Sequence, residues 1–200
     1  MSTASPTLRH LSGLPVAPAR LSESALIIVD AQNTYRSGVM QLTDVEPALD
    51  ECARLLARAR ALRVPVVHIQ HDAGPGSPYD PKAECGAIAD KVAPVVGEPV
   101  VVKHYPNSFV GTELDGHLKA AGVKNLVIVG FMTHMCINST ARGAFNLGYA
   151  VTVPAAATAT RALPAPDGSV IEAAALQSAA LAALADLFAV VVANGAAIPD

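Results

Sequence analysis

The chain has 200 residues, of which 52% are hydrophobic and 16% are charged, and its formal net charge is −3. This composition excludes an intrinsically disordered chain, and without a basic surface for phosphates we expect no nucleic-acid partner. The three cysteines are odd in number and form no CxxC pair, so they indicate a reducing cytoplasm rather than a disulfide framework. Asp186 interrupts the most hydrophobic region and no apolar stretch is long enough to cross a bilayer, so we expect no membrane partner.

The first half of the chain begins with a Pro- and Ser-rich segment, residues 1–24, which lacks the apolar run of a signal peptide and predicts a flexible N-terminal arm. Residues 25–200 then predict one domain. Its first elements, in chain order, are a strand at 25–29, a helix at 47–62, a strand at 64–69, a Gly- and Pro-rich loop at 71–82, a short helix at 84–93 and a strand at 99–103. Thr43 and Glu46 have the spacing of a capping box ahead of the first helix.

The second half continues this alternation. Its elements are a helix at 113–121 closed by Gly122, a strand at 125–129, a helix at 136–147, a strand at 149–153, a last helix after the capping-box pair Ser169 and Glu172, and a strand at 188–192. Short, continuously apolar strands between amphipathic helices are typical of a parallel sheet that is covered on both faces. The sequence therefore predicts a single α/β domain.

Three chemically reactive residues follow predicted strands. Asp30 ends the first strand, Lys103 ends the third, and Cys136 comes shortly after the fourth. Taken singly, such an Asp is commonly a loop residue, such a Lys is commonly solvated, and a lone Cys is commonly a small buried hydrophobe. Ligands of parallel sheets bind at the carboxyl ends of the strands, so the joint appearance of all three at that edge favours a site.

The surroundings of Cys136 add to this interpretation. Thr133 is a plausible helix N-cap, which would place Cys136 in the first helical turn, where free N–H groups and the helix dipole favour a thiolate. The same N–H groups are suited to bind the oxyanion of a tetrahedral intermediate. Cys52, on a core-facing helix stripe, and Cys85, beside a loop, lack this setting and are interpreted as structural.

Three separated motifs carry a resemblance to a known family. They are DAQN from Asp30, Lys103 with SFVGTEL at 108–114, and GFMTHMCINSTARGAFNLGY at 130–149. In this order and spacing they resemble the isochorismatase-like cysteine hydrolases over about residues 25–192. The resemblance implies a Rossmann-like three-layer sandwich with a six-stranded parallel sheet and an Asp30–Lys103–Cys136 catalytic triad. It also implies a cis peptide between Phe131 and Met132, with the backbone N–H groups of Met132 and Cys136 as oxyanion donors.

The same resemblance implies hydrolysis of an amide-type C–N bond in a small molecule, without a cofactor. True isochorismatases hydrolyse an enol ether and lack the cysteine, so Cys136 argues against that reaction. Nicotinamidases of the superfamily carry an Asp-x-His metal pair after the second strand, where this chain has His71-Asp72-Ala73, so we expect no metal. His68, His71 and Asp72 are better explained as a satisfied polar cluster, because adjacent strand residues point to opposite faces.

The expected mechanism is acyl transfer. Cys136 attacks the carbonyl carbon, Asp30 takes the thiol proton and passes it to the leaving amine, and Lys103 stabilises the thiolate. The candidate substrate-binding residues, for each of which core packing or a surface position is the alternative, are Asn33, Tyr35, Tyr105, Phe109 and His134, with Tyr79 and Asn107 as further candidates. Tyr35 and Phe109 are preferred because they lie within a few residues of the triad.

Two other classes of function remain open. A nucleotide-binding module is disfavoured, since no GxGxxG follows the first strand and no Walker A loop is present. A catalytically silent assembly or binding module of the same fold would have lost triad members, and this chain retains all three. The hydrophobic content and the family resemblance predict a homodimer or homotetramer.

Overall fold

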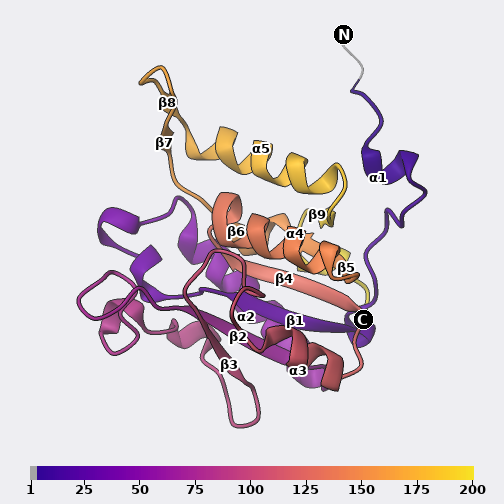
Figure 1. Ribbon diagram of the computed structural model, residues 1–200, viewed down its shortest axis with the longest axis horizontal. Helices are drawn as coiled ribbons and strands as arrows, with labels where there is room; N and C mark the ends of the chain where they lie inside the picture. The colour runs from indigo at the N-terminus through magenta and orange to yellow at the C-terminus, as the bar shows by residue number, and fades with distance from the viewer. Residues whose placement is uncertain (1–3) are drawn as a thin grey trace.

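The computed structural model describes residues 4–200 and has a central sheet between layers of helices (Figure 1). In chain order the elements are α1 (Leu8–Leu11), β1 (Ser24–Val29), α2 (Val45–Leu62), β2 (Val66–His71), β3 (Val100–Lys103), α3 (Leu114–Ala120), β4 (Asn125–Phe131), a π-helical turn (Thr133–Ile137), α4 (Asn138–Asn146), β5 (Ala150–Pro154), β6 (Thr158–Ala159), β7 (Leu163–Pro164), β8 (Val170–Ile171), α5 (Ala173–Ala185) and β9 (Val190–Val192). All six predicted strands are present.

The strands of the main sheet are all parallel and lie in the order β3-β2-β1-β4-β5-β9. The chain moves outward in one direction from β1 to β3 and in the other direction from β4 to β9, so the topological switch point lies between β1 and β4. The predicted six-stranded parallel sheet is confirmed, with the two-residue β6 added beside the end of β4. Residues that follow β1 and β4 are therefore neighbours in space.

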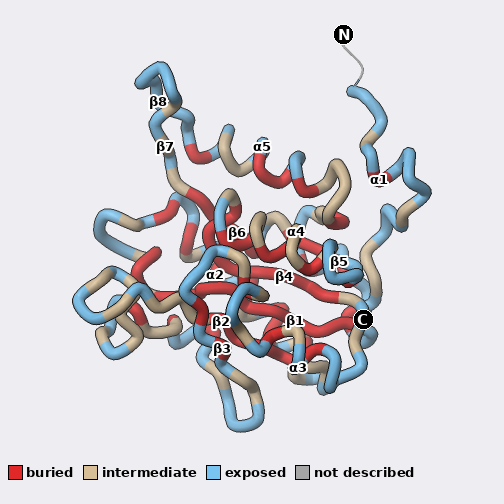
Figure 2. The backbone as a smooth tube through the Cα atoms, in the orientation of Figure 1, coloured by how far each residue is buried: buried red, intermediate tan, exposed pale blue. Residues whose placement is uncertain are grey.

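The apolar strands are explained by burial on both faces of the sheet. Leu26 and Ile28 of β1 belong to the core beneath α2, whereas Ala25, Ile27 and Val29 belong to the core beneath α3, α4 and α5. Because both sides of the central strands are covered, most of their positions are apolar, as in the run from Ala25 to Val29. Figure 2 shows this buried centre, with exposed residues mainly in loops, on outer helix faces and in the β7–β8 hairpin. The three-layer α/β architecture is confirmed.

The predicted capping boxes do not form. The N-cap of α2 is Asp44, whose backbone is left-handed with φ 57° and whose side chain makes no capping hydrogen bond. Glu46 binds Arg36 and Lys91 instead. A capping box needs an extended N-cap residue, so the left-handed turn at Asp44 rules it out. The second box fails because Glu172 is itself the N-cap of α5, while Ser169 bonds Asp167 in the preceding turn.

The predicted short helix at 84–93 is also wrong. The segment forms two 3₁₀ turns, Glu84–Gly86 and Asp90–Val92, separated by extended backbone. That extended stretch pairs with the loop after β1, since the Ala89 N–H donates to the Ala31 carbonyl and the Asn33 N–H donates to the Ala87 carbonyl. Its backbone groups are thus committed to a tertiary pairing and are not available to a helix.

Residues 158–171 contain structure that the sequence pattern did not predict. Thr158 and Ala159 form β6 beside Gly130 and Phe131, and β7 and β8 form a hairpin that projects from the body (Figures 1 and 2). Each of these strands has two residues, which is too short for any hydrophobic period to be recognised.

Part of the predicted N-terminal arm is in contact with the domain. Arg9 is 6% exposed, and its side chain donates to the carbonyl oxygens of Pro15 and Leu187. The Arg9 backbone N–H donates to the carbonyl oxygen of Asp186. Leu21, in the 3₁₀ turn ahead of β1, is fully buried. Residues 1–3 of the arm lie outside the described residues.

The most apolar helix is α5, whose 13 residues carry no charge. Leu181 and Leu184 face the core, and alanines cover much of its outer side. Neither α5 nor any other helix within residues 4–200 combines the length and apolar character required to cross a membrane.

Candidate active site

The three residues singled out by their positions after strands meet at the carboxyl edge of the sheet. Asp30 directly follows β1, with a left-handed backbone at φ 47°. Lys103 is the last residue of β3, and Cys136 lies in the π-helical turn after β4. Because β4 adjoins β1, the turn carrying Cys136 lies beside Asp30, and the long Lys103 side chain reaches them from two strands away.

One ammonium group joins the cluster. Lys103 Nζ lies 2.8 Å from Asp30 Oδ2, 3.4 Å from Cys136 Sγ and 3.3 Å from His71 Nδ1. Asp30 and Lys103 are fully buried and Cys136 is 6% exposed. A carboxylate, a cation and a thiol in mutual contact away from water are the groups needed for nucleophilic attack with proton transfer. The predicted assembly of these three side chains is confirmed, while their catalytic roles stay a prediction.

Close approach of the two strand ends requires a glycine. Gly130, the residue before Phe131, has φ 109°, and a Cβ atom there would lie 2.0 Å from the Val29 carbonyl oxygen. No side chain fits in that space. Gly130 thus allows the turn after β4 to lie directly against the residue before Asp30.

Burial dominates the electrostatics of the acid and the thiol. Burial raises the pKa of Asp30 above its usual value, and the Lys103 charge opposes that shift. Burial, reinforced by the Asp30 charge, raises the pKa of the Cys136 thiol to about 12, although Lys103 acts in the opposite direction. Desolvation thus outweighs the helix end and the cation, which were expected to favour the thiolate.

The turn that carries Cys136 also differs from the expected helix start. Met132, not Thr133, is the N-cap, and Thr133 Oγ1 is buried with no hydrogen-bond partner among the described residues. The chain makes a π-helical turn here before α4 begins at Asn138. The cis peptide predicted between Phe131 and Met132 is present. The assignment of the Met132 and Cys136 N–H groups as oxyanion donors stays a prediction.

His71 is a member of the cluster that was considered only as a metal ligand or a polar bystander. It ends β2 and is the register partner of Lys103. Burial, followed by the Lys103 charge, lowers the pKa of His71 to about 4, so the ring is neutral at pH 7 and its Nδ1 accepts a hydrogen bond from Lys103. The pairing of two parallel strand ends is the signal that would have revealed this contact.

Aromatic side chains form one wall beside the cluster. The Tyr79 ring packs edge-on against His71 at 5.0 Å between centroids and against Tyr35 at 5.8 Å, and Tyr35 in turn packs on Phe131 at 5.7 Å. Tyr35 is 1% exposed, and burial, followed by the Asp30 charge, raises its pKa. Tyr35 and Tyr79 are thus at the site.

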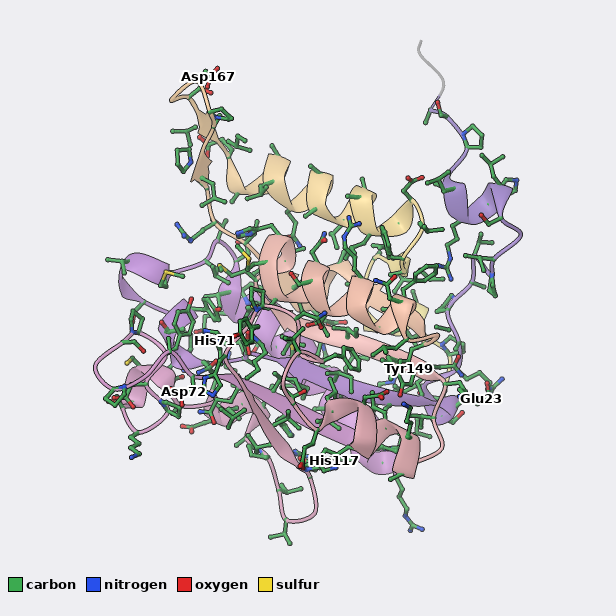
Figure 3. All side chains as sticks on the ribbon, viewed as in Figure 1. Glu23, His71, Asp72, His117, Tyr149 and Asp167 are labelled. Carbon is green, nitrogen blue, oxygen red and sulfur yellow. The ribbon has the colours of Figure 1, made fainter. Side chains whose placement is uncertain are left out.

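The other pocket candidates are more scattered. Phe109 stacks on Tyr149, which precedes β5 at the opposite edge of the sheet, far from His71 in Figure 3. Asn107 packs against Gly143 of α4, and Tyr105 is 58% exposed. The loop after β3 therefore runs along α4 and away from Cys136, which sequence proximity to Lys103 could not reveal.

Two further candidates border the site. Asn33 donates to the Glu84 carbonyl in the loop pairing that covers the end of β1. His134, two residues before Cys136, lies with its Nδ1 2.5 Å from Thr160 Oγ1, just beyond β6. Both side chains are partly exposed and border the carboxyl edge of the sheet.

The family model of the isochorismatase domain matches residues 24–195, a range that includes Asp30, Lys103 and Cys136. The chain belongs to the isochorismatase family. The secreted isochorismatase effector Isc1 of Verticillium dahliae is 34% identical over 94% of this chain and 97% of its own length. The ureidoacrylate amidohydrolase of Stutzerimonas stutzeri is 33% identical over 72% of this chain and 75% of its own length. The relatives thus support hydrolase activity on amide-type bonds.

Solved structures of the isochorismatase family share the fold. The crystal structure of an isochorismatase from Pseudomonas putida KT2440 superposes with a TM-score of 0.91 at 38% identity, covering 94% of this chain and 97% of that one. The match extends across the sheet and the helices on both its faces, so the three-layer arrangement is that of the family.

The histidines and acids near β2 do not form one cluster in this family member. His68 Nε2 lies 2.9 Å from Glu98 Oε2 on the face covered by α2. Asp72 accepts the Gly74 N–H within its own loop, and His71 contacts Lys103. Across residues 4–200, no three His, Cys, Asp or Glu side chains are grouped to hold a metal ion. The absence of a metal requirement remains a prediction for elemental analysis.

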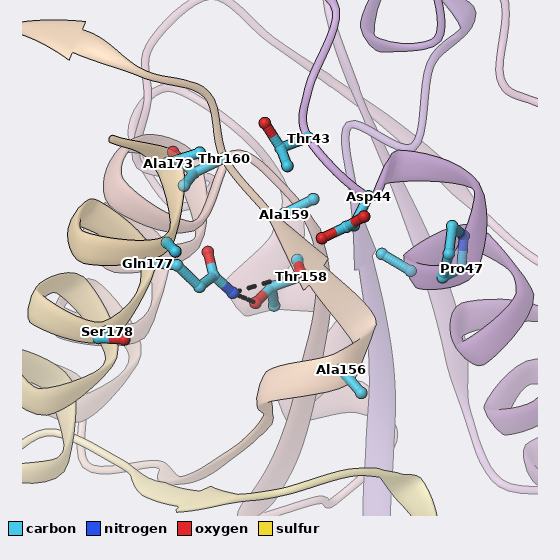
Figure 4. A pocket seen from close by; sticks show the side chains of 12 residues that line it. Thr43, Asp44, Pro47, Ala156, Thr158, Ala159, Thr160, Ala173, Gln177 and Ser178 are labelled. Atoms are coloured by element: carbon cyan, nitrogen blue, oxygen red, sulfur yellow. Dashed lines mark hydrogen bonds between the residues drawn. The ribbon is translucent and has the colours of Figure 1, made fainter. Parts of the chain in front are cut away.

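A cavity of about 460 Å³ lies between the start of α2 and α5, with β6 along one wall (Figure 4). Its lining includes Asp44, Thr158, Thr160 and Gln177, and Gln177 donates to Thr158 across it. None of Asp30, Lys103 and Cys136 lines this cavity. We therefore do not assign the reaction to it.

Proposed function

We propose that this chain is a cysteine-dependent hydrolase that cleaves an amide-type C–N bond of a small molecule through a thioester on Cys136. The observation that carries the proposal is the buried Lys103 ammonium, which contacts both the Asp30 carboxylate and the Cys136 sulfur at 2.8 Å and 3.4 Å. The amidohydrolase among its relatives supports the choice of bond.

The first half-reaction begins from a neutral thiol. As Cys136 Sγ bonds to the carbonyl carbon, its proton passes to Asp30, whose raised pKa makes it a stronger base than an exposed carboxylate. Lys103 remains charged beside the sulfur and offsets the negative charge that develops there. Asp30 then gives the proton to the nitrogen as the C–N bond breaks, which releases the amine and leaves the thioester.

The second half-reaction regenerates the enzyme. Water attacks the thioester carbonyl while Asp30, again a carboxylate, accepts a proton from it. The C–S bond breaks, the proton returns to the sulfur, and a carboxylic acid is released. One amide and one water thus give one amine and one acid, with no redox change and no cofactor.

Trapping of the acyl-enzyme tests the proposal. Wild-type protein is mixed with a panel of small primary amides, ureido acids and lactams and quenched in acid. Intact-mass spectrometry has to show the mass of the acyl adduct. Peptide mapping after digestion then has to place the adduct on the peptide that contains Cys136. We expect Cys136→Ala to remain folded, to form no adduct and to lose turnover. Substantial amidase activity in purified Cys136→Ala would refute the assignment.

Assembly and location are further parts of the proposal. The apolar outer side of α5 and the hydrophobic composition support a homodimer or homotetramer. Light scattering at micromolar concentration tests this assembly, and the detection of monomer alone would contradict it.

Three free cysteines support a reducing compartment such as the cytoplasm. The Verticillium relative is a secreted protein, so fractionation of the source cells is the deciding measurement.

A further inference from the structure

His71, the last residue of β2, is a titratable side chain that the mechanism leaves unused. Its Nδ1 atom lies 3.3 Å from Lys103 Nζ. A lysine ammonium has three N–H donors and no acceptor, so Nδ1 has to supply the lone pair and the proton of the neutral ring is on Nε2. Burial, followed by the Lys103 charge, lowers the pKa of His71 to about 4, which keeps the ring neutral at pH 7. The contact with Lys103 thus fixes the tautomer.

The Nε2–H donor of His71 is free. It has no hydrogen-bond partner within residues 4–200, and unlike the carboxylate oxygens of Asp30 it is not a buried atom. Asp30 and Lys103 are fully buried and Cys136 is 6% exposed, whereas His71 is partly exposed. Among these four side chains, His71 therefore presents the most accessible polar group to a small molecule.

Contacts on several sides hold the imidazole in place. The buried Gln32 side chain, which follows Asp30 by two residues, accepts the His71 backbone N–H and donates to the His71 carbonyl oxygen, both at 3.0 Å. Tyr79 packs edge-on against the ring, with 5.0 Å between centroids. A donor that is fixed before a ligand arrives loses little conformational entropy on binding. The Nε2–H is thus a preorganised donor.

The imidazole is a near neighbour of the nucleophile. His71 Nδ1 and Cys136 Sγ lie 3.3 Å and 3.4 Å from the same atom, Lys103 Nζ. Burial raises the pKa of the Tyr79 hydroxyl, which also lies within the field of Cys136. The ring, the tyrosine that packs on it and the sulfur therefore border the same part of the carboxyl edge.

Lys103 and the three side chains that contact it carry no net charge together. Asp30 and Cys136 share one proton and hence one negative charge, which the Lys103 ammonium balances. The His71 ring is neutral, because its pKa is about 4. A buried charge without a partner is costly, whereas a neutral oxygen satisfies an N–H donor and leaves this balance intact. A hydroxyl or carbonyl oxygen is therefore the acceptor that suits the free donor.

We infer that His71 Nε2–H donates a hydrogen bond to a hydroxyl or second carbonyl oxygen on the acyl part of the substrate, while Cys136 attacks the amide carbonyl. The inference rests on the proposed hydrolase function. A site built to hydrogen-bond one substrate group discriminates against analogues that lack it, because its donor is then left unpaired. His71 is thus a substrate-binding residue through one nitrogen and a positioning residue for Lys103 through the other.

Amide substitutions separate the two nitrogens of His71. The asparagine side chain ends near the place of Nδ1 and supplies an acceptor to Lys103 there, but it has no group at the place of Nε2. The longer glutamine side chain carries an N–H to the place of Nε2 and leaves Lys103 without its acceptor. His71→Leu removes both groups. Three variants of one residue thus test the substrate contact and the Lys103 contact independently.

Labelling of Cys136 by iodoacetamide, followed by peptide mapping, tests the Lys103 contact without turnover. His71→Gln and His71→Leu should slow labelling about three- to tenfold, because the buried ammonium loses one of its three acceptors, whereas His71→Asn should stay within about twofold of wild type. In Lys103→Met, His71→Gln should have no further effect, since it acts through that ammonium. Exposed Cys85 is the internal control and has to keep its labelling rate. Equal rates at Cys136 in the three variants overturn the inference.

The substrate contact is tested with amides in which a methyl group replaces the oxygen group. The pairs are glycolamide with propionamide, 3-hydroxypropionamide with butyramide, and acetoacetamide with isovaleramide. For the best pair the wild-type kcat/KM should favour the oxygen-bearing amide by about tenfold or more, and His71→Asn and His71→Leu should remove most of that preference through KM, while His71→Gln retains it.

His117→Leu is the matched control, since His117 of α3 is exposed and its side chain makes no hydrogen bond within residues 4–200. It has to keep the wild-type preference. An equal kcat/KM for both members of every pair in the wild type, or an equal loss for both members in His71→Leu, overturns the inference. Thermal melting of each variant shows whether such an equal loss comes from damage to the fold.

Binding separates this inference from the proposed reaction. Calorimetry with Cys136→Ala measures the affinity for each panel compound without turnover, and Cys136→Ala/His71→Leu is the comparison. If wild-type protein hydrolyses no compound, but the oxygen-bearing amides bind Cys136→Ala more tightly than their partners and the difference disappears in the double variant, the His71 contact stands and the hydrolase proposal fails. Equal binding of the partners, or no binding of any panel compound, overturns the inference.

Discussion

Two groups of ionisable side chains pack on this sheet, one on the face covered by α2 and the other at the carboxyl edge. Only the second is suited to catalysis. In the first, Glu98 accepts two hydrogen bonds from Arg60, one from the Val95 backbone, and lies 2.9 Å from fully buried His68. In the second, the Asp30 carboxylate is fully buried beside Lys103, and neither of its oxygens has a well-aligned hydrogen-bond donor among the described residues.

The two acids respond in opposite directions. Hydrogen bonds from Arg60 outweigh burial and lower the pKa of Glu98 to about 2. Burial outweighs Lys103 and raises the pKa of Asp30. A carboxylate with all its acceptor positions filled remains ionised and inert, whereas one that is desolvated and incompletely bonded accepts a proton more readily. The difference between structural and reactive ion clusters is thus the completeness of hydrogen bonding.

The largest expected effect is the loss of the reactive acid. Asp30→Asn removes the proton acceptor, so kcat should fall by roughly a thousandfold. Alkylation of Cys136 by iodoacetamide should not slow, because the negative charge that raises the pKa of the thiol is gone. Glu98→Gln, the matched change in the structural cluster, should keep turnover close to wild type. Equal losses in the two variants would erase the distinction between the clusters.

The second effect concerns the cation. Lys103→Met should slow both turnover and alkylation, turnover by about a hundredfold, because the developing thiolate loses its nearest positive charge. Stopped assays with amide substrate and iodoacetamide labelling measure the two rates. Lys103→Arg is not a safe control, since a planar fork does not replace a compact ammonium. Unchanged alkylation in Lys103→Met would remove Lys103 from the role assigned to it.

A smaller effect is expected from pH. Asp30 has to be ionised to accept the thiol proton, so kcat/KM should fall about tenfold per pH unit below its pKa, which burial raises above 3.8. His71, with a pKa of about 4, should add no step between pH 5 and 8. A profile that stays level down to pH 3.8 contradicts the raised pKa of Asp30. Glu98→Gln should leave the position of this limb unchanged.

The smallest effect is a change in stability without a change in chemistry. Glu98→Gln should lower the free energy of unfolding at pH 7 by about 1.5–3 kcal/mol, through weaker bonds to Arg60 and His68. Because the folded-state pKa of Glu98 is lowered from 4.5 to about 2, this contribution is present above pH 4.5 and is lost as the pH falls toward 2. Urea denaturation at several pH values should therefore show the two proteins converging in acid. A constant difference across that range would contradict the assignment.

The sequence by itself determined the layers of this protein and the edge of the sheet at which its candidate catalytic residues meet. Strands that are buried on both faces are mostly apolar, so the strand from Ser24 to Val29 and its five partners were recognisable without a structure. Parallel strands end at one edge, so Asp30, Lys103 and Cys136 were predictable neighbours. Only the resemblance to a family, however, gave the cis peptide before Met132.

The tertiary structure decided everything that depends on desolvation and on contacts between distant segments. Burial raises the pKa of Cys136 despite the adjacent cation, and no local pattern reports how much water a side chain has lost. Phe109 turns toward Tyr149 and Tyr79 reaches the site from a loop, because packing rather than distance along the chain sets where aromatic rings lie. Thr160 meets His134 at the same edge only because a two-residue strand, too short to have a period, pairs with the end of β4.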